Sequence, residues 1–194
     1  MADRISVGIL ISGRGSNMEA IVDYERAAGP SYQVILVASN APEARGLMLA
    51  RRFGIKTWAH SHKGLERSEF DRLLDDALRA AGVEVVALAG YMRLLSPWLV
   101  GRWSDRMLNI HPSLLPLYPG LDTHARALQA GDVEAGCTVH LVTEGVDEGP
   151  ILDQARVPVL AGDTAADLAA RVLTAEHALY PRALADFCRR IRSS

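Results

Sequence analysis

Asn109 and His111 are the residues whose types and spacing best suit catalysis. They end a short apolar segment, and in a β-strand a spacing of two directs both side chains to one face. Pro112 disfavours helical backbone at His111, so the pair is expected at the end of a strand. A side-chain amide could hold an oxyanion, and an imidazole could move a proton. A capped strand end with a structural histidine has the same spacing, which alone does not separate the two interpretations.

A turn containing Gly15, Ser16 and Asn17 is a second candidate site. It lies between an apolar segment at 5–11, typical of a strand buried on both faces, and a helical segment at 18–28. Backbone N–H groups at the start of a helix favour bound anions, so the turn suits a phosphate. The alternative is an ordinary tight turn in which Ser16 or Asn17 caps the helix.

A dinucleotide does not fit this turn. Met18 replaces the third small residue of the Gly-x-Gly-x-x-Gly pattern. Ser39 and Asn40 follow the second predicted strand, residues 33–38, where an acidic ligand for a ribose would be expected. The sequence also lacks a Walker motif. The turn therefore favours a single phosphate monoester.

Strands and helices alternate along most of the chain. Further helices are predicted at residues 42–52, 65–81, 97–103 and 123–130. Further strands are predicted at residues 55–59, 83–89, 137–142 and 151–159. The alternation indicates a doubly wound parallel sheet with ligands at the carboxyl ends of its strands, and the last two strands are hairpin-like and therefore antiparallel. A long helix from residue 164 to about 192, kinked at Pro181, is expected to follow.

The composition excludes several classes of protein. A chain of 194 residues with 49% hydrophobic and 23% charged residues fits one globular domain. A net charge of −2 gives no general attraction for nucleic acid or an anionic membrane. No apolar run approaches the ~20 residues of a membrane span, and residues 1–4 lead into the first strand without the regions of a signal peptide. Cys137 and Cys188 form no disulfide framework, so a reduced, cytoplasmic setting is expected.

Three weaker features allow two interpretations each. Residues 91–95 mix apolar side chains with an arginine at a predicted strand end, which fits either a pocket for a flat amphipathic ligand or a buried connector. Arg67 lies near the start of an amphipathic helix, where most arginines are solvated. His60 and His62 suggest a metal, but no third ligand has a matching spacing, so no metal site is predicted.

Longer motifs make the sequence resemble a known family nearly end to end. The matching segments are ISGRGSN, AGYMRLLS, NIHPSLLPLYPGLDTHARAL, GCTVH, DEGPI and EHALYP. They resemble the small, monofunctional bacterial phosphoribosylglycinamide formyltransferases. The NIHPSLLP segment is typical of the wider superfamily that uses 10-formyltetrahydrofolate, and GSN after the first strand of a short chain narrows the resemblance to the glycinamide ribonucleotide enzymes.

The resemblance implies a Rossmann-like formyltransferase fold, a mixed, mostly parallel sheet with helices on both faces and antiparallel strands near the C-terminal part. It implies one domain over residues 1–194, with a nucleotide- and phosphate-binding half at 1–100 and a catalytic and folate-binding half at 101–194. The implied reaction moves a formyl group from 10-formyltetrahydrofolate to the amine of glycinamide ribonucleotide in de novo purine synthesis, without a metal. The implied partners are these two small molecules, with neither nucleic acid nor membrane, and either a monomer or a homodimer.

Individual residues also acquire implied roles. Asn109, His111 and Asp147 match the catalytic trio of the family. The positions that match contacts to the ribonucleotide are Gly15, Ser16, Asn17, Arg67, Gly90 and Glu176. The positions that match the folate pocket are Met92, Arg93, Leu94, Leu95, Asn109, Thr143, Glu144, Gly145, Val146 and Asp147. Thr138 and His140 lie on a strand beside the catalytic residues in a supporting role. Leu117 and Leu173 stand where many members carry Lys and Gln, which puts substrate affinity in question.

The groups of the trio suit formyl transfer. Attack of an amine on the formyl carbon gives a tetrahedral species with a negative oxygen and a positive nitrogen. The amide of Asn109 can donate to that oxygen at any pH, and protonated His111 is a second, charged donor. A carboxylate from Asp147 beside His111 would favour the imidazolium and could relay the amine's proton to the departing folate nitrogen.

Three alternatives share part of this pattern. A formyltetrahydrofolate hydrolase would use water in place of the amine, but such proteins usually carry a regulatory domain ahead of the formyl-transfer domain, and here the first strand begins at residue 5. Methionyl-tRNA formyltransferase shares the trio but needs a further domain and a basic surface. A folate- or nucleotide-binding module without catalysis is disfavoured by the intact trio.

Overall fold

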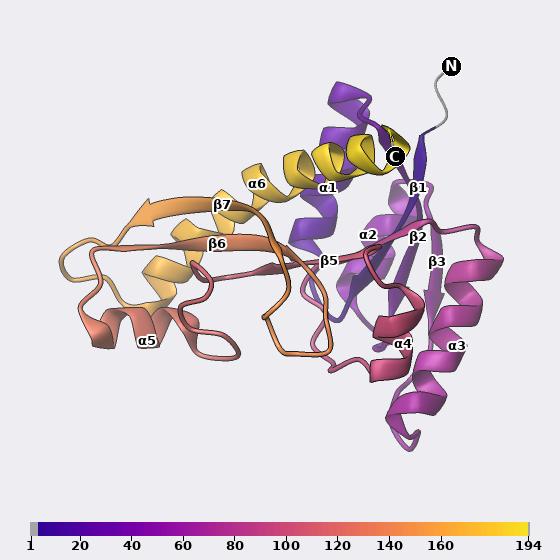
Figure 1. Ribbon diagram of the computed structural model, residues 1–194, viewed down its shortest axis with the longest axis horizontal. Helices are drawn as coiled ribbons and strands as arrows, with labels where there is room; N and C mark the ends of the chain where they lie inside the picture. Colours follow the sequence, from indigo (N-terminus) through magenta and orange to yellow (C-terminus); the bar gives the residue numbers. More distant parts are fainter. Residues whose placement is uncertain (1–3, 194) are drawn as a thin grey trace.

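The computed structural model describes residues 4–193. Residues 1–3, part of the predicted start without a signal peptide, lie outside the described residues. The described part forms one seven-stranded sheet flanked by helices (Figure 1). The strands are β1 (Ile5–Ile11), β2 (Tyr32–Ser39), β3 (Lys56–Ala59), β4 (Val85–Leu88), β5 (Met107–His111), β6 (Glu134–Leu141) and β7 (Ile151–Pro158). The helices are α1 (Ser16–Ala28), α2 (Arg45–Arg52), α3 (Arg67–Ala80), α4 (Pro97–Arg102), α5 (Thr123–Ala130) and α6 (Ala165–Ser193).

The strand order is β3-β2-β1-β4-β5-β6-β7. Strands β1 to β5 pair in parallel, whereas β6 is antiparallel to β5 and β7 is antiparallel to β6. This confirms the mixed, mostly parallel sheet expected from the sequence. The chain builds outward from β1 to β3 and then returns to place β4 on the other side of β1. The carboxyl ends of β1 and β4 are therefore the switch point of the sheet, where ligands bind in such folds.

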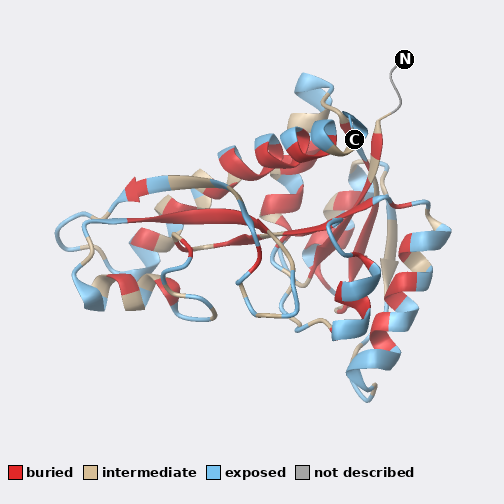
Figure 2. Ribbon diagram, viewed as in Figure 1, coloured by how far each residue is buried: buried red, intermediate tan, exposed pale blue. Residues whose placement is uncertain are grey.

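Two apolar cores cover the two faces of the sheet. The core against α1, α2 and α6 takes Ile9 and Ile11 from β1, whereas the core against α3 and α4 takes Leu10. This alternation is the two-residue period of a strand buried on both faces. Figure 2 shows the central strands buried, with β7 at the edge only partly covered.

The long C-terminal helix α6 is fixed to the strands that lead into the site. The buried hydroxyl of Tyr180 donates to the carbonyl oxygens of Leu88 (3.0 Å) and Leu108 (3.2 Å), which belong to β4 and β5. The helix continues through Pro181 to Ser193. A proline removes only one backbone donor from the helix, and the packing on both sides of this position holds the remaining turns.

Most predicted boundaries agree with the structure to within about two residues, but the starts of α2 and β6 differ by three. The helix expected from Pro42 begins at Arg45, because the preceding residues form a turn in which the N–H of Ala44 donates to the carbonyl of Ala41 (3.0 Å). The strand expected at 137–142 begins at Glu134, which pairs with Pro158 at the end of β7. Among residues 4–193 no helix is long and apolar enough to cross a membrane.

Candidate active site

The last parallel strand and the first antiparallel strand bring the predicted catalytic side chains together. Within β5, Asn109 and His111 share one face, as their spacing predicts. The antiparallel register pairs Asn109 with His140 and His111 with Thr138 across to β6. The Nδ2 atom of Asn109 lies 3.2 Å from Nε2 of His140. The register of this strand pair therefore supplies a second imidazole next to the amide.

His111 is held by acceptors on both sides of its ring. Its Nε2 atom lies 2.9 Å from the carbonyl oxygen of Tyr118, and its Nδ1 atom lies 3.2 Å from Oδ2 of Asp147. A carbonyl and a carboxylate accept hydrogen bonds and cannot donate them. The ring satisfies both neighbours only when both nitrogens carry a proton. In that doubly protonated form the ring carries a positive charge beside the site, and both of its N–H groups are taken up by Tyr118 and Asp147.

Asp147 comes from the loop between β6 and β7, which folds back beside the catalytic strand. Its Oδ2 atom also accepts the N–H of Gly120 (2.9 Å), and its Oδ1 atom lies 3.5 Å from Nε2 of His140. Burial acts to raise the pKa of Asp147, but the hydrogen bonds from His140 and Gly120 and the charge on His111 outweigh it and hold the pKa below its usual value. Asp147 is therefore an anion beside His111 at neutral pH.

His140 orients the amide of Asn109. Its Nδ1 atom lies 2.9 Å from the carbonyl oxygen of Leu141, so this nitrogen carries the hydrogen. In the neutral ring, Nε2 then accepts one N–H of Asn109 and leaves the second N–H of the amide for a ligand. When His140 is protonated, Nε2 donates to Asp147 instead. The proposed supporting role of His140 thus corresponds to direct contacts with two members of the trio.

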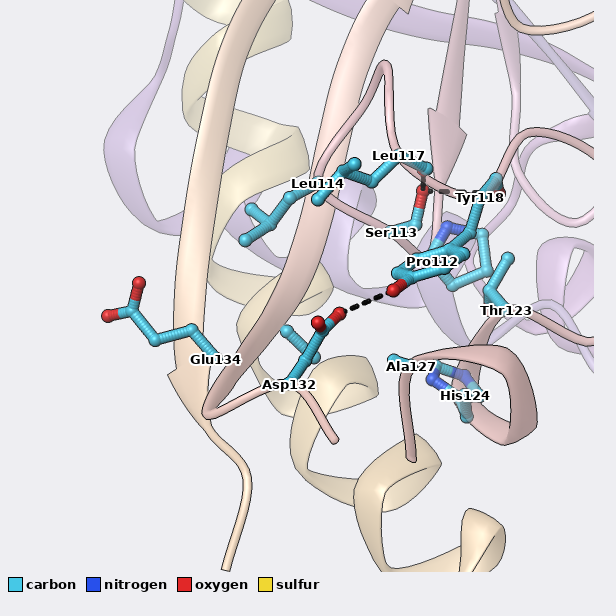
Figure 3. Close-up of a pocket in the computed structure, with 11 residues that line it drawn as sticks. Pro112, Ser113, Leu114, Leu117, Tyr118, Thr123, His124, Ala127, Asp132 and Glu134 are labelled. Carbon is cyan, nitrogen blue, oxygen red and sulfur yellow. Dashed lines mark hydrogen bonds between the residues drawn. The ribbon is translucent and has the colours of Figure 1, made fainter. Parts of the chain in front are cut away.

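A tightly bonded segment after β5 fixes the carbonyl that His111 contacts (Figure 3). The hydroxyl of Ser113 donates to the carbonyl of Leu117 (2.6 Å), and the hydroxyl of Tyr118 donates to Asp132 (2.7 Å). The cavity among these side chains measures about 10 Å³, which is room for no more than one water molecule. This region supports the site from behind and holds no substrate.

Two adjoining cavities meet at the predicted catalytic residues Asn109 and Asp147. The larger, of about 910 Å³, is lined by Asn109, His111 and Asp147 together with Asn17, Gly90 and Glu176 from the predicted ribonucleotide site. The smaller, of about 160 Å³, is lined by Asn109, Asp147 and His140. It is also lined by the predicted folate residues Arg93, Leu94, Leu95, Thr143, Glu144, Gly145 and Val146. The remaining folate residue, Met92, is 73% exposed and lines the larger cavity.

The predicted phosphate turn has the geometry of an open helix start. Gly15 is the N-cap of α1 with φ +79°, and no side chain caps the helix. A Cβ atom on Gly15 would lie 2.9 Å from the Cα atom of Gly46, so glycine is required for both its backbone angle and its close approach to α2. Ser16 begins the helix, and the free N–H groups of its first turn face the carboxyl end of β1.

Asn17 and Glu176 form a buried pair at the floor of the larger cavity. The Nδ2 atom of Asn17 donates to Oε2 of Glu176 (2.6 Å), whereas its Oδ1 atom is buried without a hydrogen-bond partner. Burial raises the pKa of Glu176, and the bond from Asn17 opposes that shift only in part. The pair therefore presents an unsatisfied amide oxygen and a carboxyl group to a polar ligand such as a sugar.

Four predicted residues line neither of these cavities: Gly15 and Ser16 of the turn, and Arg67 and Thr138. Arg67 begins α3, on the opposite face of the sheet from α1, and is exposed without lining either cavity. Thr138 is fully buried, where its hydroxyl donates to the carbonyl of Ser113 (2.7 Å) and accepts the N–H of Leu115 (3.0 Å). Thr138 thus supports the segment behind His111 rather than the cavity.

Two site residues were not predicted at all, and a third, Tyr91, was predicted only as part of the candidate pocket segment 91–95. His124 lines the larger cavity, and burial together with the charge on His111 lowers its pKa. Tyr91 lines both cavities beside the predicted folate residues. Gly120 contributes only its backbone N–H to Asp147, so its residue type carries no signal for the role. For His124 the only available signal was its place within the long motif that follows Asn109.

Comparisons with known proteins agree with this geometry. Residues 5–184 match the family model described as formyl transferase. The chain is 46% identical to a phosphoribosylglycinamide formyltransferase of Escherichia coli, over 94% of the chain and 87% of that protein. A crystal structure of a phosphoribosylglycinamide formyltransferase from Brucella melitensis is 52% identical, with a TM-score of 0.92 over 96% of each chain.

Some relatives are much longer proteins. The chain is 49% identical to a trifunctional purine biosynthetic protein of Drosophila melanogaster, over 94% of the chain but only 14% of that protein. The chain thus spans about a seventh of the length of such relatives. The match over nearly all of the E. coli protein is therefore the more informative one. The chain belongs to the formyl transferase family, within its phosphoribosylglycinamide formyltransferases.

Proposed function

We propose that this protein transfers the formyl group of 10-formyltetrahydrofolate to the amine of glycinamide ribonucleotide, a step of purine biosynthesis. The observation that carries the proposal is the contact of Asn109, His111, His140 and Asp147 where two cavities meet. In this proposal each cavity receives one substrate, the smaller one only the ring system of the folate, and the groups at their junction suit acyl transfer. The names of the relatives support the same reaction.

In this proposal the sugar and the amine of the ribonucleotide occupy the larger cavity, and its phosphate extends beyond the cavity to the neighbouring turn. Its phosphate binds the N–H groups of the open turn at Gly15 and Ser16, and its ribose hydroxyls reach Asn17 and Glu176. Anchoring the phosphate far from the amine lets binding energy position the amine for attack. A contact from Arg67 is also proposed from the resemblance, although this side chain lies on the other face of the sheet.

The ring system of the formyl donor occupies the smaller cavity. Residues 92–95 and 143–147 form its walls, and Asn109 and Asp147 lie where the two cavities adjoin. The apolar side chains among these residues suit the flat ring of a folate, and the backbone groups of both loops suit its polar edge. No metal enters the proposed reaction, and among residues 4–193 no cluster of three or more metal-ligand side chains is present.

The reaction proceeds by direct attack. As the amine nitrogen bonds to the formyl carbon, the carbonyl π electrons move to its oxygen, which receives a hydrogen bond from Asn109. The imidazolium of His111 stabilises this oxygen by its charge, because its two N–H groups are taken up by Tyr118 and Asp147. The amine's proton passes to Asp147, directly or through water, and then to N10 of the folate. The C–N10 bond breaks with its electron pair on nitrogen, and the carbonyl re-forms in the product. One oxyanion donor is typically worth about 10²–10³ in rate.

The proposal is tested by following deformylation of 10-formyltetrahydrofolate by absorbance, with and without glycinamide ribonucleotide. Turnover that requires the ribonucleotide, and that is lost in His111→Asn, is the expected result. Turnover without the ribonucleotide would show a hydrolase instead. Binding of tetrahydrofolate without any turnover would show a binding module. Asp153→Asn, which changes an exposed carboxyl on β7, is the control for loss of charge.

A further inference from the structure

The two substrate loops leave adjacent strands at the switch point of the sheet. The loop after β1, here called the phosphate loop (Ser12–Ser16), leads to α1 on one face. The loop after β4, here called the folate loop (Gly90–Ser96), leads to α4 on the other face. Because the loops diverge, the packing of either face alone does not set the distance between them. Pairing of β1 with β4, which ends where the N–H of Ala89 donates to the carbonyl of Leu10 (2.9 Å), fixes only where the loops begin, and a direct link between the loops would fix the segments beyond it.

Ser12 provides such a link through its backbone and its side chain. Its N–H donates to the carbonyl of Gly90 (3.2 Å), and its hydroxyl accepts the N–H of Met92 (2.8 Å). The hydroxyl donates its own hydrogen to Oδ1 of Asn40 (2.6 Å), at the end of β2. Since a hydroxyl has one hydrogen, this bond to Asn40 leaves a lone pair of Ser12 for Met92.

Further contacts make this link rigid. Asn40 is buried, and Nδ1 of His62 lies 3.0 Å from its carbonyl oxygen and 3.2 Å from its Nδ2 atom. On its other side, the phosphate loop is fixed to α2 because the N–H of Gly46 donates to the carbonyl of Gly13 (3.0 Å). Three consecutive strand ends and the folate loop thus share one connected set of hydrogen bonds.

The bond from Met92 to Ser12 contributes little to folding. Met92 is 73% exposed, so water can satisfy its N–H when the serine hydroxyl is absent. Ser12 lines neither of the two cavities, and its hydroxyl is occupied by Asn40 and Met92 rather than open to a substrate. What the hydroxyl does supply is a fixed position of the folate loop relative to the phosphate loop.

We propose that Ser12 is a positioning residue that sets the separation of the phosphate loop and the folate loop, so that the ribonucleotide amine and the formyl carbon meet at His111. The inference rests on the proposed function, because it requires both substrates bound at once. A misplacement of the reacting atoms by about 1 Å can cost about 100-fold in rate. Loss of the Ser12 hydroxyl therefore lowers kcat while each substrate still binds its own loop.

The test compares kcat and both KM values of Ser12→Ala, Ser12→Thr and Asn40→Ala with those of the wild type. Ser12→Ala is expected to lower kcat by about 10- to 100-fold with both KM values within about threefold. Ser12→Thr keeps the hydroxyl and restores most of the rate. Asn40→Ala removes the oxygen that accepts the Ser12 hydroxyl, and it lowers kcat by less than Ser12→Ala does. Ser61→Ala is the matched control, because it removes a serine oxygen that accepts a backbone N–H in an exposed turn.

A second measurement separates positioning from folding and from the proposed function. Tetrahydrofolate is titrated into each variant with and without the ribonucleotide, and each Tm is measured. We expect Ser12→Ala to fold with a somewhat lower Tm, because the buried Oδ1 atom of Asn40 loses its donor, and to keep the wild-type affinity for tetrahydrofolate in both titrations. Wild-type kcat in Ser12→Ala, or a loss of kcat that Ser12→Thr shares, would overturn the inference. Absence of ribonucleotide-dependent turnover in the wild type would overturn the proposed function and the inference with it. If Ser12→Ala does not fold, the kcat of Asn40→Ala takes its place: a lowered kcat supports the inference, and a wild-type kcat overturns it.

Discussion

Asp147→Asn should reduce turnover by about three decades without unfolding the protein. The carboxylate accepts from His111 at 3.2 Å and from the N–H of Gly120 at 2.9 Å, and it lies 3.5 Å from His140. An amide of the same shape can still accept from Gly120, and its NH₂ group can face the neutral ring of His140. It no longer supplies the negative charge beside the imidazolium or a place for the amine's proton.

The expected size of the effect follows from these two losses. Unit charges about 4 Å apart attract by about 4 kcal/mol near a protein surface, and desolvation cancels part of that. A positioned proton-transfer group contributes about 10²–10⁴ in rate, or about 2.7–5.4 kcal/mol. The two losses overlap, because the same carboxylate performs both roles. A decrease of about 10³ in kcat is therefore expected, with little change in KM for the ribonucleotide.

The assay is ribonucleotide-dependent deformylation, measured across a range of pH. Asp153→Asn on the neighbouring strand β7 controls for the general effect of removing an acidic side chain. Thermal unfolding of both variants confirms that the fold is kept. If Asp147→Asn retains turnover within tenfold of the wild type and an unchanged pH profile, the carboxylate neither relays a proton nor supports the imidazolium. The acid–base assignment would then be wrong.

Three further predictions test separate parts of the site. His111→Asn should raise the pKa of His124, because the charge on His111 adds to burial in lowering it; an unchanged NMR titration of His124 would show that His111 is uncharged. Gly15→Ala should destabilise the fold by more than Gly29→Ala. Both glycines have positive φ, which costs an alanine about 1–2 kcal/mol, but only a Cβ atom at Gly15 meets neighbouring atoms. Equal losses in denaturant unfolding would refute the argument from close approach. Burial raises the pKa of Glu176 above its usual value of 4.5, so the folded protein keeps a proton that the unfolded chain releases. Stability therefore falls as the pH rises from 4.5 through the raised pKa of the folded state. Glu176→Gln should remove this slope, at most about 1.4 kcal/mol per pH unit, from unfolding curves measured between pH 4.5 and neutrality.

Periodicity and turn residues were sufficient to predict the sheet and its helices. The apolar β-branched run of β1 and the alternation of strands with helices are local patterns, and they led to the correct parallel arrangement. The start of α2 was wrong because Pro42 fits the first turn of a helix as well as it fits a β-turn. Which alternative forms depends on the hydrogen bond from Ala44 to Ala41, a contact that no propensity describes.

The candidate site was only partly predictable for a different reason. The spacing of Asn109 and His111 places them on one face of any strand, so this part followed from the sequence alone. The contact of His140 with Asn109 requires one register of an antiparallel pair, and a slip of one residue would turn His140 to the other face. Asp147 reaches His111 only because the β6–β7 loop folds back beside β5. The resemblance named these residues, but only the three-dimensional structure explains their contacts.

The change from parallel to antiparallel pairing explains why the acid–base groups gather at β5. A parallel neighbour would require a crossover of a dozen or more residues, usually a helix, before the chain could return to the sheet. Because β6 and β7 are antiparallel, only the loop between Leu141 and Ile151 separates them. This short connection keeps Asp147 within 3.2 Å of His111, on the strand where parallel pairing ends. The parallel strands therefore provide the crevice at the switch point, and the antiparallel pair supplies the carboxylate and the second imidazole of the proposed reaction.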